Sequence, residues 1–171
     1  MLWQYIITAI SAVVFFGFVY WGVRKFGLLS CYSAYGMKWE AEKSKYGGTN
    51  LWQVITIVAP LLIVPAIVPT GDGSPWQFTA FLGPVSLMFV GATPDYAINK
   101  LQNVLHQIGA FGSAIFITLY VILIPKMLWV ILAVLAALLV CALITGFKKT
   151  WLFWAEMAMY LSTYIVVFAI I

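Results

Sequence analysis

Hydrophobic residues fill six continuous blocks of the chain, and short polar or charged links separate them. The blocks are Trp3–Val23, Leu51–Val68, Phe78–Thr93, Val104–Ile124, Met127–Phe147 and Trp151–Ile171. A helix of about 20 apolar residues is long enough to cross a bilayer. Strands of a membrane barrel would instead alternate apolar and polar positions. The pattern therefore predicts an all-α fold: a polytopic membrane bundle of six transmembrane helices, in a single domain covering residues 1–171.

The boundaries of two blocks need separate arguments. The first block resembles a signal peptide in hydropathy, but no basic residue precedes it and Arg24 and Lys25 follow it directly. No small-residue cleavage site follows it either, so we expect a retained helix. The third block is the shortest and contains Pro84. A miscount by splitting or fusing a span is the alternative, and the tight Pro125-Lys126 hairpin is its weakest junction.

Basic residues gather on one side of the predicted bundle. Eight of the nine lie in the first, third and fifth links or at their helix ends: Arg24, Lys25, Lys38, Lys43, Lys45, Lys100, Lys148 and Lys149. Only Lys126 lies on the side that carries both termini. Cytoplasmic loops are enriched in Lys and Arg. We therefore expect a multi-pass protein of the plasma (inner) membrane, with both termini outside and the long first loop in the cytoplasm.

Composition agrees with a membrane protein and narrows the partners. Hydrophobic residues make up 64% of the chain and charged residues 8%, with a mean hydropathy of +1.04, which excludes a soluble globular domain. The net charge of +4 is accounted for by helix ends, so no nucleic-acid partner is expected. Cys31 and Cys141 have no ligand at metal-binding spacing. We predict neither a metal nor a cofactor.

The long first loop, residues 24–50, carries a periodic aromatic pattern. Tyr32, Tyr35, Trp39 and Tyr46 follow one another at three, four and seven residues, which aligns them on one helical face. Ser30 is placed to cap the start, and Gly47-Gly48 to stop the helix, although Gly36 interrupts it. We expect a short interfacial helix with its aromatic side toward the lipid. The alternative is a lid over a pocket that opens to the cytoplasm.

Polar side chains inside the apolar blocks supply the candidate site. Glu156 is the only carboxylate well inside a block, and intramembrane charges usually face the bundle and mark function or pairing. The candidates for a ligand or proton site are His106, Glu156, Asp95, Tyr160 and Ser113. His106 and Glu156 both lie at a shallow depth from the cytoplasmic side of the membrane, so their side chains are placed to contact each other. A purely structural contact between helices is the alternative, and the small residues Gly109, Gly112 and Ser113 are typical of close helix packing.

One stretch resembles a known group of proteins. The sequence reads Gly91-Ala-Thr-Pro94-Asp95 at the end of the third block and Leu105-His106-Gln-Ile-Gly109-Ala110 in the fourth. It resembles the small six-helix membrane proteins of unknown function grouped loosely as Frag/Dram-type, over about 20 residues and the helix count. The resemblance implies a six-helix bundle and singles out Gly91, Pro94 and His106. It brings no enzymatic activity with it.

Three classes of function stay open. The favoured class is a binding or scaffold protein that holds a lipid or small hydrophobic ligand or assists a larger membrane complex. The second is a small oligomeric transporter or channel that uses His106 and Glu156 as a proton- or ligand-coupling pair. The third is a lipid-modifying enzyme with His106 as base and Asp95, Tyr32 or Ser33 as partner. No catalytic signature is present, so we predict no catalytic residues. The expected partners are the bilayer, a bound lipid, and a second copy or a larger complex.

Overall fold

The structure is a computed structural model, and it describes residues 2–171. All regular elements in that range are helices, so the predicted all-α fold is confirmed. They are α1 (Leu2–Phe26), α2 (Ser33–Glu42), η1 (Lys43–Tyr46), α3 (Leu51–Ile67), η2 (Val68–Gly71), α4 (Gln77–Gly91), α5 (Lys100–Leu123), α6 (Leu128–Thr145) and α7 (Phe147–Ile170).

Five helical segments are long and apolar enough to cross a membrane: α1, α3 together with η2, α5, α6 and α7. This supports the prediction of a multi-pass membrane protein. The sixth predicted block corresponds to α4, which is apolar but only 15 residues long. At 1.5 Å per residue α4 spans roughly 22 Å, less than the roughly 30 Å of a hydrocarbon core. Length and composition thus support five crossings directly.

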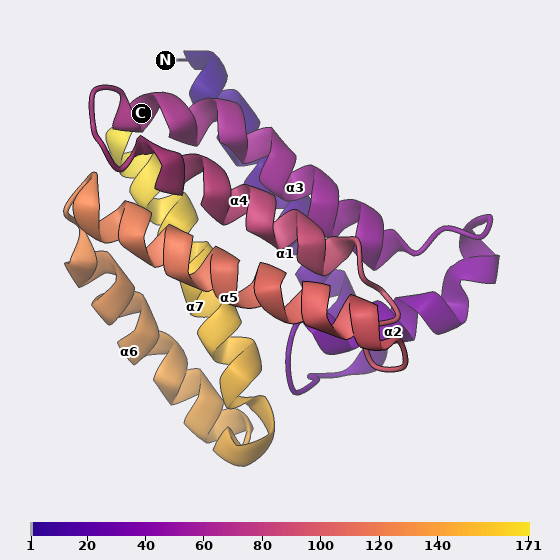
Figure 1. The fold of residues 1–171 in the computed structure, drawn as a ribbon. Coiled ribbons are helices and arrows are strands. Elements are labelled where there is room, and N and C mark those ends of the chain that lie inside the picture. Colours follow the sequence, from indigo (N-terminus) through magenta and orange to yellow (C-terminus); the bar gives the residue numbers. More distant parts are fainter. Residues whose placement is uncertain (1) are drawn as a thin grey trace.

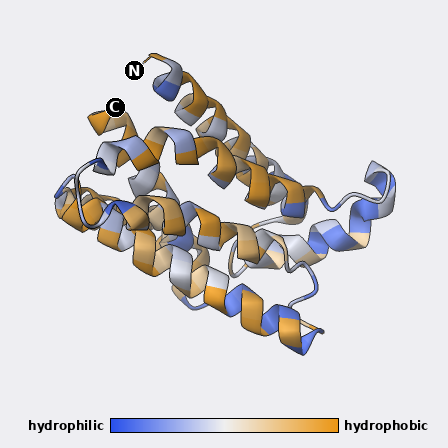
Figure 2. Ribbon diagram, turned by 45° about the horizontal axis from the view of Figure 1, so that its top comes forward, coloured by the Kyte–Doolittle hydropathy of each residue, from blue (hydrophilic) through white to orange (hydrophobic). Residues whose placement is uncertain are grey.

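Most of the long helices pack against the next one along the chain, with α5 and α6 as the exception (Figure 1). α1 packs against α3, α3 against α4, and α4 against α5, while α7 contacts α1, α5 and α6. α6 lies at the edge of the bundle, and Figure 1 shows both chain ends at one end of the molecule, with α2 at the other. Hydrophilic residues concentrate around α2 and η1 (Figure 2), whereas the long helices are mostly hydrophobic.

Small residues let α4 and α5 approach closely. A Cβ atom on Gly109 of α5 would lie 2.7 Å from the backbone oxygen of Ser86, and one on Gly112 would lie 2.9 Å from the Ser86 hydroxyl oxygen. Real Cβ atoms do not come this close, so Gly109 is needed against the Ser86 backbone, whereas at Gly112 the Ser86 side chain would have to move. Of the three small residues expected to serve helix packing, Gly109 and Gly112 lie at this close approach of α4 and α5.

The predicted helix in the first loop exists, but its aromatic side does not face lipid. Tyr32, Tyr35 and Trp39 are at most 2% exposed, and they pack into the bundle beside Phe15 and Trp52. Tyr46 is half-buried against the same cluster. The physical reason is that the aromatic face finds a larger apolar surface on the bundle than the interface offers.

Of the two predicted ends of this helix, one is confirmed and the other is wrong. The predicted stop is confirmed, because η1 ends at Tyr46 and Gly47 follows in a left-handed conformation. The predicted Ser30 cap is wrong: α2 begins at Ser33, and its N-cap residue, Tyr32, makes no side-chain cap hydrogen bond. The Ser30 carbonyl instead accepts a hydrogen bond from the backbone N–H of Phe153, which ties the loop to α7.

Candidate functional site

A cavity of about 410 Å³ lies between α5 and α7, at the end of the bundle that carries α2. This volume falls within the range of small-molecule sites. α5 contributes residues spaced four apart, and α7 does the same. The lining residues are Cys31, Ser33, Val90, Tyr96, His106, Gln107, Ala110, Phe111, Ala114, Leu152, Ala155, Glu156, Met159 and Tyr160. Cys31 and Ser33, which lie just before and at the start of α2, contribute to this lining.

Glu156 directs a carboxylate into this cavity. One of its oxygens, Oε2, accepts a hydrogen bond of 2.6 Å from the backbone N–H of Tyr32. Within residues 2–171 its other oxygen, Oε1, has no hydrogen-bond partner, and no salt bridge reaches the carboxylate. The described lining residues include no lysine or arginine. The carboxylate therefore has one oxygen left to bind a ligand or a proton.

His106 is held by hydrogen bonds on both ring nitrogens. Nε2 lies 2.9 Å from Ser33 Oγ, and Nδ1 lies 3.1 Å from Thr93 Oγ1. The Thr93 hydroxyl donates its hydrogen to the Phe89 carbonyl at 2.8 Å, so it accepts from Nδ1–H. Nε2 is then the acceptor for the Ser33 hydroxyl. This network assigns the tautomer of a neutral imidazole.

Tyr96 completes the wall around His106. The two rings are stacked, with centroids 4.0 Å apart and planes 18° apart. Tyr96 lies in the link between α4 and α5, and burial raises the pKa of its phenol to about 12. Burial also raises the pKa of the Cys31 thiol, and the nearby Glu156 adds to this shift. Both groups thus stay protonated near neutral pH and present neutral surfaces to the cavity.

The structure brings together some of the predicted site residues but not all. His106, Glu156 and Tyr160 line the same cavity. Among the described residues no hydrogen bond or ion pair joins His106 to Glu156, so the direct contact suggested by their depth is not made. Asp95 and Ser113 lie outside the cavity lining. Ser113 is 1% exposed, and its hydroxyl finds no partner in the described part of the chain.

Several residues of the site were not predicted from the sequence. Thr93, Tyr96 and Cys31 lie in links or at helix ends, where helical periodicity carries no information about direction. Ser33 was considered only as a partner in the enzyme alternative, and the structure places it against His106. Tyr32 was expected in an interfacial face, whereas its backbone N–H binds Glu156. The one feature of the sequence that could have indicated these residues is their position. Each lies within two residues of a helix end, or in the Gly91–Asp95 turn and the link that follows it.

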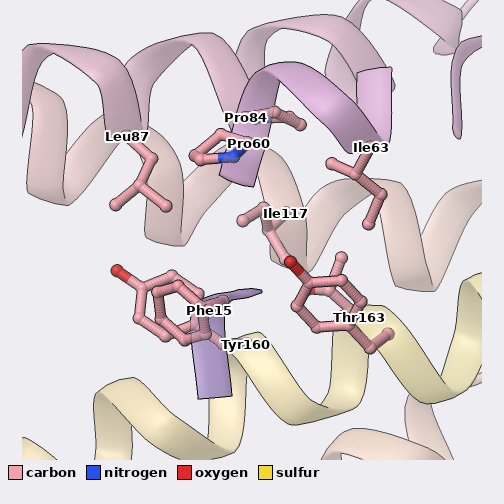
Figure 3. A pocket seen from close by; sticks show the side chains of 9 residues that line it. Phe15, Pro60, Ile63, Pro84, Leu87, Ile117, Tyr160 and Thr163 are labelled. Atoms are coloured by element: carbon pink, nitrogen blue, oxygen red, sulfur yellow. The ribbon is translucent and has the colours of Figure 1, made fainter. Parts of the chain in front are cut away.

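A second, smaller cavity of about 30 Å³ lies deeper in the bundle (Figure 3). Tyr160 and Thr163 reach it from α7, and Pro84 and Leu87 reach it from α4. Tyr160 lines both cavities and therefore forms part of the wall between them.

Comparisons of the chain with protein-family models, with curated proteins and with solved structures give no match. The resemblance to Frag/Dram-type proteins therefore stays a prediction from about 20 residues, and the function is argued from the cavity alone.

Proposed function

We propose that this protein is an integral membrane binding protein whose cavity holds a lipid or another small amphipathic molecule. The observation that carries the proposal is the division of the cavity into a polar end and an apolar body. Glu156, His106 and Ser33 form the polar end. Ala114 of the apolar body lies eight residues beyond His106 on α5, roughly 12 Å farther along the helix.

The rim of the cavity supports entry from the bilayer. Phe111 of α5 is 68% exposed and Leu152 of α7 is 40% exposed, and both also line the cavity. Exposed apolar side chains on two neighbouring helices are suited to contact lipid chains. A ligand with its polar group at Glu156 would extend its apolar part between α5 and α7 toward the membrane.

Native mass spectrometry of the gently extracted protein, with identification of lipids and small molecules, tests this proposal. Ala110→Trp fills the apolar body, whereas Ala136→Trp adds the same side chain to an exposed position of α6. We expect a stoichiometric ligand on the wild type and on Ala136→Trp, and its loss from Ala110→Trp. A wild-type chain without a ligand would contradict the proposal. A chain held only by another protein would favour the scaffold interpretation, and the same spectra measure any homo-oligomer.

We propose further that the protein crosses the plasma (inner) membrane six times. Support comes from the eight basic residues in the predicted cytoplasmic links and from α4, which packs between α3 and α5 despite its length. An even number of crossings also agrees with chain ends that lie at the same end of the molecule (Figure 1). Both termini are then outside, the first loop is cytoplasmic, and the helix count matches the Frag/Dram-type resemblance.

A transporter is the second candidate, and one observation favours it. Tyr160 lines both the large cavity and the small, mostly apolar cavity, so a movement of this side chain would connect the two. His106 and Glu156 would then act in the same cavity without direct contact. Ligand uptake or proton flux in reconstituted vesicles distinguishes this function, because a binding protein shows neither.

A further inference from the structure

We infer that the cavity selects amphipathic molecules whose polar group is cationic, with Glu156 as the recognition residue. The inference rests on the proposed binding function and narrows its ligand class. It starts from the charge of the lining. Glu156 is the only acidic residue there, and the described lining includes no lysine or arginine to neutralise it.

The hydrogen bonds of Glu156 leave room for such a group. The Tyr32 N–H occupies only Oε2, so Oε1 is available at the cavity surface. Burying a carboxylate without a partner is costly, whereas a bound cation compensates for the lost hydration. Ligand binding thus supplies the counter-ion that the protein does not.

The surrounding side chains favour a cation over an anion. Tyr96, Phe111 and Tyr160 present aromatic groups to the cavity, and aromatic faces attract ammonium groups. His106 has no N–H left to donate into the cavity, because Nδ1–H binds Thr93 and Nε2 accepts from Ser33. An anionic group would meet Glu156 without finding a cationic partner. The chemistry therefore fits a primary amine or quaternary ammonium on an alkyl chain.

Binding of three probes with the same ten-carbon chain tests the inference. The probes end in a trimethylammonium, a hydroxyl or a carboxylate group, and binding is measured on the full chain in lipid nanodiscs. We expect the ammonium probe to bind the wild type about tenfold more tightly than the alcohol, and the carboxylate most weakly. Glu156→Gln should bring the ammonium and alcohol affinities together and leave alcohol binding in place.

Asp95→Asn is the matched control. It removes a carboxylate from the link before α5, close in sequence to the cavity residue Tyr96 but outside the lining. We expect it to preserve the tenfold preference, which excludes an effect of net charge on the membrane surface. Equal binding of ammonium and alcohol to the wild type, or a preference that survives Glu156→Gln, would overturn the inference alone. Absence of binding by all three probes would overturn the binding function as well.

Discussion

At the scale of single residues, His106 is the most constrained polar group of the site. Its two ring nitrogens bind Ser33 and Thr93, and its ring stacks on Tyr96. Truncation removes two hydrogen bonds and an aromatic contact, so we expect His106→Ala to destabilise the fold by about 2 kcal/mol. Thermal or denaturant unfolding in detergent, followed by tryptophan fluorescence, measures this change.

A double-mutant cycle separates the Ser33 contact from the rest. Ser33→Ala and His106→Ala remove the same hydrogen bond, so their effects should be non-additive by about 1 kcal/mol. Ser113→Ala is the comparison, because Ser113 is also buried but its hydroxyl has no partner within residues 2–171. Additive effects for Ser33 and His106 would contradict the hydrogen bond between Ser33 Oγ and His106 Nε2.

The sequence indicated the two main polar residues of the site but not the residues that form hydrogen bonds with them. Glu156 and His106 were identified because an isolated polar side chain in an apolar block is energetically costly in a membrane and usually marks a functional or pairing site. Their partners were missed, since Tyr32 acts through its backbone and Thr93 lies at a helix end. Equal depth along two helices does not fix the rotation of each helix about its own axis. That rotation decides whether two side chains touch or only share a cavity.

At the scale of elements, α2 depends on one close approach. A Cβ atom on Gly36 would lie 2.9 Å from Cε3 of Trp52, a side chain that is completely buried. Overpacking of this kind costs about 1–3 kcal/mol, which exceeds the gain of about 1 kcal/mol from replacing glycine by alanine in a helix. We expect Gly36→Ala to lower the stability of the protein and to loosen α2, detectable as faster amide hydrogen exchange over residues 33–42.

Gly17→Ala provides the matched control, because Gly17 also lies inside a helix and a Cβ there meets no atom within 4 Å. We expect Gly17→Ala to leave stability unchanged or raise it by up to about 1 kcal/mol. A neutral Gly36→Ala would show that α2 does not pack on Trp52 as described. The aromatic spacing of the first loop predicted this helix and the residues of its apolar face. Spacing alone does not distinguish protein from lipid as the apolar partner, which explains the wrong orientation.

At the scale of the whole molecule, the hydropathy pattern specified the helices more completely than their number of crossings. Each of the six predicted blocks coincides with a long helix or with α4. The exception is α4, because 15 residues reach only part of the way across a typical hydrocarbon core. Short helices are accommodated by local thinning of the bilayer or by cover from neighbouring helices. α3 and α5 flank α4 in this way.

The location of the two termini decides between five and six crossings. With six, both termini lie outside the cytoplasm; with five, they lie on opposite sides of the membrane. We expect alkaline phosphatase fused after Ile171 to be active and a green fluorescent protein at the same position to be dark, because only the phosphatase matures outside. A tag inserted at Gly47-Gly48, next to η1, should give the opposite result, since that loop carries Lys38, Lys43 and Lys45. Opposite locations for tags at the N- and C-terminal ends would instead leave α4 as a helix that does not cross the membrane. The cavity would still lie between α5 and α7, but its polar end would then have to be reassigned to a side of the membrane.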